Sequence, residues 1–322
     1  MLSLGLHGRP MTRGLKLYIG LIYQVNHNIK DPEGDVVSES FFSQSRKTFY
    51  KSLVNILSTD SNGVPSNADK NNPLSIKVAS GIARLIQAEA KGARLAGQAA
   101  GSKFEEICLA FIQNTFLKLD HLRPGKWTVA RITGRTRLAL ADFEQYSHLT
   151  AIAAATKTNR QLAAAIGSDY IITPDIIISR APEEDTVINR SEILVDETCV
   201  KLAALRKTNN CLPMLHASIS CKWTIRSDRA QNARSEALNL IGNRKGHLPH
   251  VVVITGEPLP SRIASLALGT GNIDCVYHFA LQELIATVEG LKDEEGTKDT
   301  LRTMVEGKRL KDIADLPLDL AV

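Results

Sequence analysis

Three apolar runs of strand length constrain the fold of this chain more than any other feature. They are "DYIITPDIIISR" from Asp169, "PMLHASISCKWTI" from Pro213 and "HVVVITGE" from His250. Each is rich in β-branched residues and is as long as a strand of a globular protein. We therefore expect three strands of one sheet in the second half of the chain.

A helix is expected between the last two strands. The segment "SDRAQNARSEALNLIGNRKG" has Ser227 or Asp228 as a candidate cap and Gly242 or Gly246 as a candidate stop. The order strand, strand, helix, strand predicts an α/β fold, with a mixed central sheet flanked by helices.

Helical spacing dominates the part of the chain before these strands. Apolar residues recur at helical spacing in residues 40–57, 74–97 and 102–122, and in an alanine-rich segment around residues 138–155. A polar loop rich in Asn, Ser, Asp and Pro separates the first two segments. We expect one domain over residues 36–322, with a helical N-terminal part (36–124), an α/β core (125–290) and C-terminal helices (291–322).

The composition is that of an ordinary globular protein. The 322 residues are 43% hydrophobic and 23% charged, and the net charge of +5 argues only weakly for a polyanionic partner. Five widely spaced cysteines without a CxxC pair indicate neither a disulfide framework nor a zinc site, and they predict a cytoplasmic protein. No run approaches the roughly 18 apolar residues of a membrane span, and the opening stretch lacks a signal-peptide cleavage site.

A lysine stands inside the second expected strand. Side chains alternate along a strand, so Ser218, Ser220 and Lys222 share one face while Ile219 and Cys221 share the other. Upstream, Asp175 interrupts the first β-branched run, where a buried carboxylate is costly unless a cation meets it. Lys222 or a metal ion is the expected cation.

Metal-dependent nucleases of the PD-(D/E)xK type build their site from an aspartate on one strand and a lysine on the next. Carboxylates there hold Mg²⁺, and the lysine positions or activates the attacking water. Pro174 and Asp175 supply the "PD", but Ser220 stands where the pattern has an acid two residues before the lysine.

The following helix offers the missing acid. Glu236 shares a face with Arg229, Asn232, Ala233 and Leu240 at helical spacing, so it reaches Ser220 if that face packs on the sheet. The alternative is a chance Pro-Asp pair beside an ordinary exposed lysine.

A cluster of charged residues lies where the strand meets the helix. We call it the arginine cluster, and it consists of Arg226, Asp228 and Arg229. Arginine donates a bidentate pair to guanine in the major groove and an acid accepts from cytosine N4, so these residues are candidates for reading G·C pairs. The alternative is a solvated helix start, but arginines in a first turn oppose the helix dipole.

Several segments of the sequence resemble those of a known family. They are "SNAD", "GSDYIITPDII", "LHASISCKWTIRSDRAQNARSE", "NRKGHLPHVVV", "PSRI", "GTGNIDCVYHFAL" and "GKRLKDIADLPLDLAV". Over residues 40–322 these resemble the NgoMIV family, tetrameric type II restriction endonucleases that cut DNA at sites containing CCGG. The resemblance implies a restriction-endonuclease-like core, Mg²⁺ as cofactor, a homotetramer engaging two copies of double-stranded DNA, and a cognate cytosine methyltransferase as a genetic partner.

The resemblance also implies residue roles. Asp175 and Glu236 look like the metal ligands, with Lys222, Ser220 and Glu105 as the remaining members of the catalytic set. The implied readers of the central CCGG are Arg226, Asp228 and Arg229. Asp69 and Arg262 look like readers of the outer G·C pair, which implies the palindrome GCCGGC cut after the first G.

The resemblance does not cover the whole chain. Residues 1–35 have no counterpart in the family pattern, so we expect a dispensable extension, and the loop "KNNPLS" after "SNAD" also departs from it. Two other functions stay open from the sequence: a DNA-binding protein of this fold that does not cut, and a repair-type nuclease.

Overall fold

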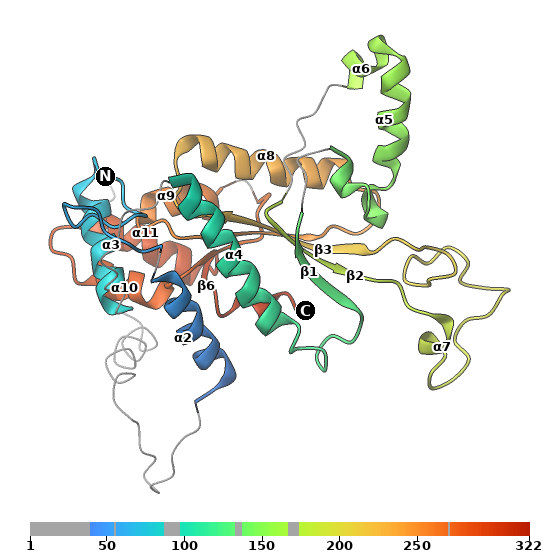
Figure 1. Ribbon diagram of the computed structural model, residues 1–322, viewed down its shortest axis with the longest axis horizontal. Coiled ribbons are helices and arrows are strands. Elements are labelled where there is room, and N and C mark those ends of the chain that lie inside the picture. The colour runs from blue at the N-terminus through green and yellow to red at the C-terminus, as the bar shows by residue number, and fades with distance from the viewer. Residues whose placement is uncertain (1–38, 55, 87–96, 133–136, 167–173, 270) are drawn as a thin grey trace, which may run out of the picture.

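The computed structural model describes residues 39–54, 56–86, 97–132, 137–166, 174–269 and 271–322. The expected extension at residues 1–35, and the part of the first strand run before Pro174, lie outside these residues. Figure 1 shows a central sheet with helices packed around it.

One mixed sheet of six strands runs through the described part of the chain in the order β1 to β6. Its first three strands pair antiparallel, and β3 to β6 pair parallel. The strands are β1 (Trp127–Arg131), β2 (Ile176–Arg180), β3 (Met214–Lys222), β4 (His250–Thr255), β5 (Cys275–His278) and β6 (Leu310–Asp312). This mixed sheet flanked by helices confirms the fold class predicted from the sequence.

The helices before the sheet core lie near their predicted places. They are α2 (Phe41–Leu53), α3 (Pro73–Leu85) and α4 (Gly97–Phe116). Side chains cap the first two: Ser40 accepts from the Ser43 amide, and Asn72 accepts from the Ser75 amide.

The remaining helices connect or follow the strands. They are α5 (His148–Thr158), α6 (Arg160–Ile166), α7 (Asp185–Ile188), α8 (Ser227–Asn243), α9 (Pro260–Ala267), α10 (Leu281–Glu289), α11 (Glu295–Glu306) and α12 (Leu316–Asp319). Figure 1 shows α5, α6 and the connection that carries α7 projecting from the body. No helix in the described ranges is long and apolar enough to cross a membrane.

The prediction of one helix around residues 138–155 was wrong. Two short 3-10 helices, Arg137–Leu140 and Glu144–Tyr146, precede α5 there. Phe143 is extended between them, and both Phe143 and Tyr146 are buried in the core.

Strands β1, β5 and β6 were missed in the sequence. The last two have four and three residues, which is too short for a period of two to be recognised. The C-terminal part predicted as helices therefore contains a strand, β6, between α11 and α12.

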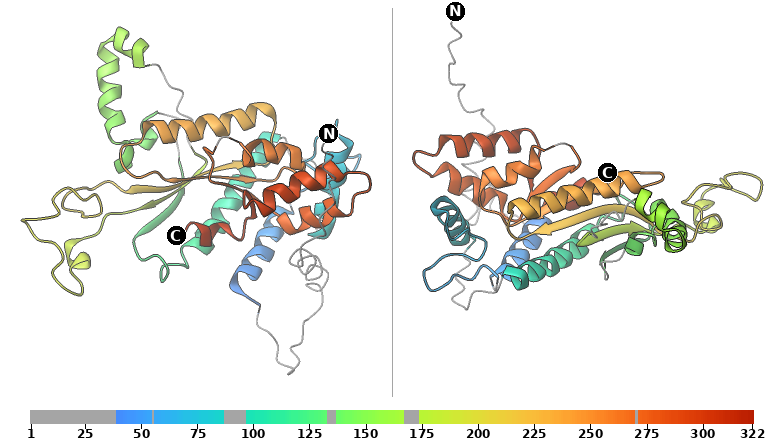
Figure 2. Two further views of the ribbon diagram at one scale, coloured as in Figure 1. Left: turned by 180° about the vertical axis from the view of Figure 1, so that it is seen from behind. Right: turned by 90° about the horizontal axis from the view of Figure 1, so that it is seen from above.

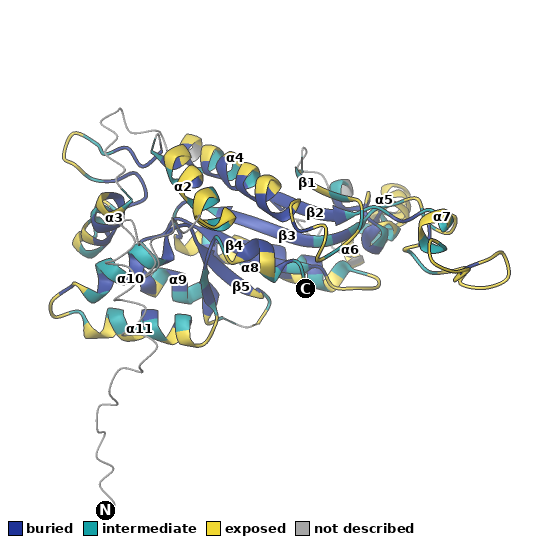
Figure 3. Cartoon of the chain, turned by 90° about the horizontal axis from the view of Figure 1, so that it is seen from below, coloured by how far each residue is buried: buried dark blue, intermediate teal, exposed yellow. Residues whose placement is uncertain are grey.

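Helices α4 and α8 cover opposite faces of the sheet (Figure 2). On the α4 face, the rings of Phe104 and Trp223 lie 5.0 Å apart. On the α8 face, the carbonyl of Leu240 accepts a hydrogen bond from the hydroxyl of Tyr146. Figure 3 shows the strands buried between these layers.

The functional residues gather where the parallel strands end. Lys222, Thr255 and His278 are in register at the ends of β3, β4 and β5. Asp175 comes directly before β2, which runs antiparallel to β3, so it lies at the same end. We call this end of the sheet, marked by these four residues, the site edge. The carboxyl ends of parallel strands are where α/β sheets bind their ligands.

Candidate active site

Asp175 and Lys222 form an ion pair at the site edge. The Lys222 ammonium donates to Asp175 Oδ2 at 3.1 Å, and the backbone amide of Cys221 donates to the same oxygen at 2.7 Å. The two side chains are only 17% and 22% exposed. The backbone of β3 thus holds the aspartate, and the lysine meets it from the same strand.

Glu236 brings a second carboxylate to this pair from α8. Its side chain is buried, and the hydroxyl of Ser220 donates to Glu236 Oε2 at 3.3 Å. Ala233 and Leu240 on the same helix face are buried, whereas Asn232 is exposed. The contact between helix and strand is the one that the helical spacing predicted.

Two acidic side chains face one basic side chain at this site. Burial raises the pKa of Glu236 to about 7, with the charge of Asp175 adding to this effect and Lys222 opposing it. Burial alone would lower the pKa of Lys222, but the charges of Asp175 and Glu236 outweigh it and the pKa is raised. Lys222 is therefore an ammonium at neutral pH, and one cation faces two acids.

Glu105 lies beside this group on α4 but has its own partner. Arg131 on β1 donates to Glu105 Oε2 at 2.6 Å. Burial and the nearby charge of Asp175 raise the pKa of Glu105, so the two carboxyl groups interact electrostatically. Among the described residues, no three His, Cys, Asp or Glu side chains are assembled as a metal site.

The arginine cluster lies at the start of α8. Arg226 is the residue before the helix, so the helix begins without a side-chain cap, and the prediction of Ser227 or Asp228 as the cap was wrong. Arg226 and Asp228 are exposed. Arg229 folds back, because its guanidinium donates to the hydroxyl and carbonyl of Thr224.

Asp69 and Arg262, which are far apart in the sequence, form an ion pair. The hydrogen bond from Arg262 holds the pKa of Asp69 below its usual value, and the amide of Asn71 and the charge of Arg226 lower it further. Arg262 lies in the first turn of α9, and Asp69 lies in the loop before α3.

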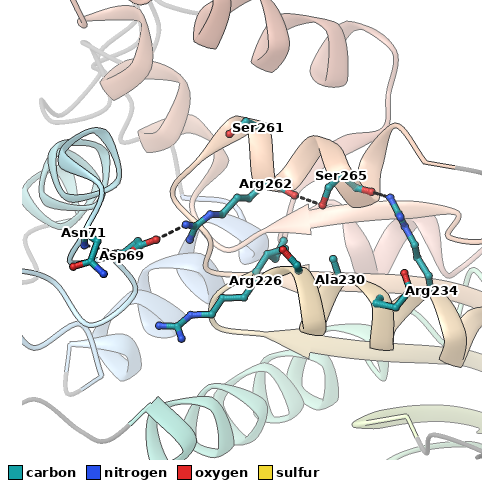
Figure 4. Close-up of a pocket in the computed structure, with 11 residues that line it drawn as sticks. Asp69, Asn71, Arg226, Ala230, Arg234, Ser261, Arg262 and Ser265 are labelled. Atoms are coloured by element: carbon teal, nitrogen blue, oxygen red, sulfur yellow. Dashed lines mark hydrogen bonds and ion pairs between the residues drawn. The ribbon is translucent and has the colours of Figure 1, made fainter.

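Three of the five candidate readers line one pocket, whereas Asp228 and Arg229 do not line it. Its volume is about 680 Å³, and Arg226, Asp69 and Arg262 all contribute to its wall. Figure 4 shows the Asp69–Arg262 pair on one side and the Arg226 side chain on the other, with Arg234 held by the carbonyl of Ser265. The pocket therefore gathers charged side chains from three separate segments.

Sequence reasoning missed Glu257, which is fully buried behind this pocket. Its position two residues after β4 was a usable signal, because carboxyl ends of parallel strands meet at one edge. It also missed Asn67, whose amide donates to the carbonyl of Gly256 at 2.8 Å. No local pattern marks that contact between segments far apart in the chain.

The model of the NgoMIV restriction enzyme family matches residues 49–322 of this sequence. The chain belongs to this family. It is 58% identical over 283 residues to the type II restriction enzyme NgoMIV of Neisseria gonorrhoeae, which covers 87% of this chain and 99% of the relative. This NgoMIV family member is thus a type II restriction endonuclease, an enzyme that binds and cuts double-stranded DNA.

A weaker likeness links the family member to a solved structure. The crystal structure of the type IIF restriction endonuclease Bse634I with cognate DNA matches with a TM-score of 0.35 and 12% identity. The match covers 80% of this chain and 92% of the other.

Replacing Lys222 should separate cutting from binding. We expect Lys222→Ala, and Lys222→Met with nearly unchanged volume, to cut DNA at least about 100-fold more slowly, because the ammonium is lost from the site edge. Binding of a specific duplex should stay within about twofold, measured by fluorescence anisotropy without divalent metal. Lys47→Ala on the exposed side of α2 is the control. A folded Lys222 variant that no longer prefers its specific duplex would contradict this role.

Proposed function

We propose that this restriction endonuclease makes Mg²⁺-dependent double-strand cuts at GCCGGC, after the first G, and leaves 5′ overhangs. The proposal rests on one observation: Asp175, Lys222 and Glu236 lie together at the site edge. Beside them is the pocket that Arg226 and Arg262 line. The 58% identity to the type II restriction enzyme NgoMIV supports the same assignment.

The residues at the site edge fit a divalent cation. Asp175 and Glu236 offer hard oxygen ligands. Burial raises the pKa of Glu236 to about 7, and a cation bound beside it would favour the charged form. Mg²⁺ is commonly held by one or two carboxylates, with waters and substrate phosphate oxygens completing its shell, so a preassembled cluster of three acids is not required. When bound, such an ion neutralises developing phosphate charge and lowers the pKa of water.

The side chains of this site have separate tasks in the proposal. Lys222, kept as an ammonium by its two acidic neighbours, contacts the scissile phosphate and orients the attacking water. Ser220 donates to Glu236 and so fixes the carboxylate that replaces the usual strand acid. Glu105 is the additional acid, and its pair with Arg131 keeps it beside Asp175 until DNA arrives.

Base reading is assigned to the charged residues around the pocket. Arg226 and Arg229 donate to the guanines of CCGG, and Asp228 accepts from a cytosine amino group. Asp69 and Arg262 read the outer G·C pair together, as an acceptor and a donor already aligned by their ion pair. Each correct bidentate contact contributes about 1–3 kcal/mol of discrimination against a wrong base.

The assembly and its setting follow from the family resemblance. We propose a homotetramer that engages two DNA copies, acts in the cytoplasm, and is accompanied in the genome by a cytosine methyltransferase that protects the host sites. Residues 1–35 are proposed to be dispensable, so a chain lacking them should cut DNA at the same rate.

Two other functions fit the site less well. A DNA-binding protein that does not cut has no chemical need for Asp175, Lys222 and Glu236 gathered at one site. A repair-type nuclease has no need for a pocket lined by base-reading arginines.

Digestion of a plasmid of known sequence tests the proposal directly. With Mg²⁺ present, sequencing of the ends should place every cut after the first G of GCCGGC, and EDTA should abolish cutting. Cuts at another sequence would overturn the assigned readers, whereas cuts without divalent metal would overturn the assigned cofactor.

The assembly has its own kinetic signature. A tetramer that binds two duplexes should cut a plasmid with two sites faster than a plasmid with one, because the tether raises the effective concentration of the second site. Rates are compared at equal, low concentrations of enzyme and of sites. Equal rates on both plasmids would indicate dimers that act independently.

A further inference from the structure

Glu257 is a buried carboxylate to which the catalytic chemistry gives no role. Its side chain has no exposed surface, and it lies in the turn between β4 and α9. Burial raises its pKa to about 7, although two backbone amides and Arg262 oppose the effect. A group that is costly to bury is expected to make contacts that a neutral side chain does not make.

The two carboxylate oxygens of Glu257 bind two different segments. Oε2 accepts from the amide of Ile225 at 2.7 Å, and Oε1 accepts from the amide of Leu259 at 3.2 Å. Ile225 directly precedes Arg226, and Leu259 is the residue before α9, which carries Arg262. The guanidinium of Arg262 also lies 3.9 Å from Oε1.

The turn around Glu257 is fixed to the catalytic strand as well. The amide of Gly256 and the hydroxyl of Thr255 both donate to the carbonyl of Lys222, at 3.0 and 2.9 Å. A Cβ at Gly256 would stand 2.5 Å from the ring of Trp223, so only glycine fits there.

The loop that carries Asp69 joins the same turn. The amide of Asn67 donates to the carbonyl of Gly256 at 2.8 Å, and Asn67 is 1% exposed. All three segments that line the pocket with candidate readers are therefore attached to residues 255–257.

We propose that Glu257 is a positioning residue for sequence recognition, which sets Arg226 and Arg262 at the separation that lets one subunit read an inner and the outer G·C pair together. The inference rests on the proposed function, because it takes these arginines as the readers. Adjacent base pairs have a fixed spacing, and bidentate contacts tolerate little displacement, so the two guanidinium groups need a common anchor.

The chemistry of the anchor requires a carboxylate. Glutamate offers two acceptor oxygens, so it accepts from both backbone amides at once. Glutamine of the same size has one acceptor oxygen and an NH₂ group, so one of the two amides would face another donor. Glu257→Gln thus breaks the shared anchor that holds the two reader segments at a fixed separation, without creating a cavity.

Asp312 provides a matched control. It is also a buried acid that accepts from two backbone amides, those of Leu281 and Ala314, and it pairs with Arg46. It lies on β6, two strands from β4, and its bonds go to no reader segment. Asp312→Asn makes the same chemical change away from the pocket.

The test measures discrimination by full-length enzyme without divalent metal. Binding constants are compared for a GCCGGC duplex, a duplex with the outer pair exchanged and a duplex with an inner pair exchanged. We expect Arg262→Ala to lose discrimination only at the outer pair and Arg226→Ala to lose it only at an inner pair. Glu257→Gln should reduce discrimination about tenfold or more at both pairs. Asp312→Asn should lose thermal stability to a similar degree but keep discrimination within twofold.

The outcomes separate the inference from the proposed function. A folded Glu257→Gln enzyme that discriminates like the parent at both pairs, while the two arginine variants do not, overturns the positioning role alone. A parent enzyme that shows no preference at these pairs overturns the proposed function and the inference with it.

Asn67→Ala keeps the inference testable if Glu257→Gln does not fold. It removes the bond to Gly256 without changing a buried charge, so discrimination should fall about threefold or more at the outer pair only. Unchanged discrimination at the outer pair in this variant would overturn the shared anchor.

Discussion

One electrostatic constraint governs the active site: two acids and a single lysine lie together, largely buried, at the end of β3. Asp175 accepts from both the backbone and the ammonium at the end of β3, while Glu236 is buried on the helix above it. Removing charges from water is costly unless their partners balance them, and burial accordingly raises the pKa of Glu236 to about 7. A divalent cation bound at the site edge would favour the charged form of both acids and would attract the phosphate of DNA.

The architecture places cutting and recognition on adjoining parts of the same elements. Lys222 ends β3, Arg226 begins the approach to α8, and Glu236 follows on that helix. A displacement of α8 would therefore move the proposed metal-binding acid, Glu236, and the proposed reader, Arg226, together. The turn after β4 links the proposed outer reader, Arg262, to this unit, because Glu257 bonds to both segments.

Simple periodicity predicted the centre of this arrangement. The alternation of β3 predicted the face of Lys222 and Ser220, and the helical period of α8 predicted that Glu236 meets Ser220. Periodicity could not predict the Asp69–Arg262 pair, whose members are 193 residues apart, and only the family resemblance pointed to it. Strands β5 and β6 were missed because three or four residues show no recognisable period, and Glu257 was missed because its bonds to Ile225 and Leu259 are set by the tertiary fold.

Moving the acid from the helix to the strand tests the central claim most directly. Glu236→Ser removes a charge, whereas Ser220→Glu combined with Glu236→Ser keeps the charge and changes only the element that carries it. The account predicts that the double variant cuts a GCCGGC duplex with Mg²⁺ more slowly than the parent, yet clearly faster than Glu236→Ser alone. If the double variant folds, binds DNA like the parent and is as inactive as Glu236→Ser, then Glu236 does not replace the strand acid.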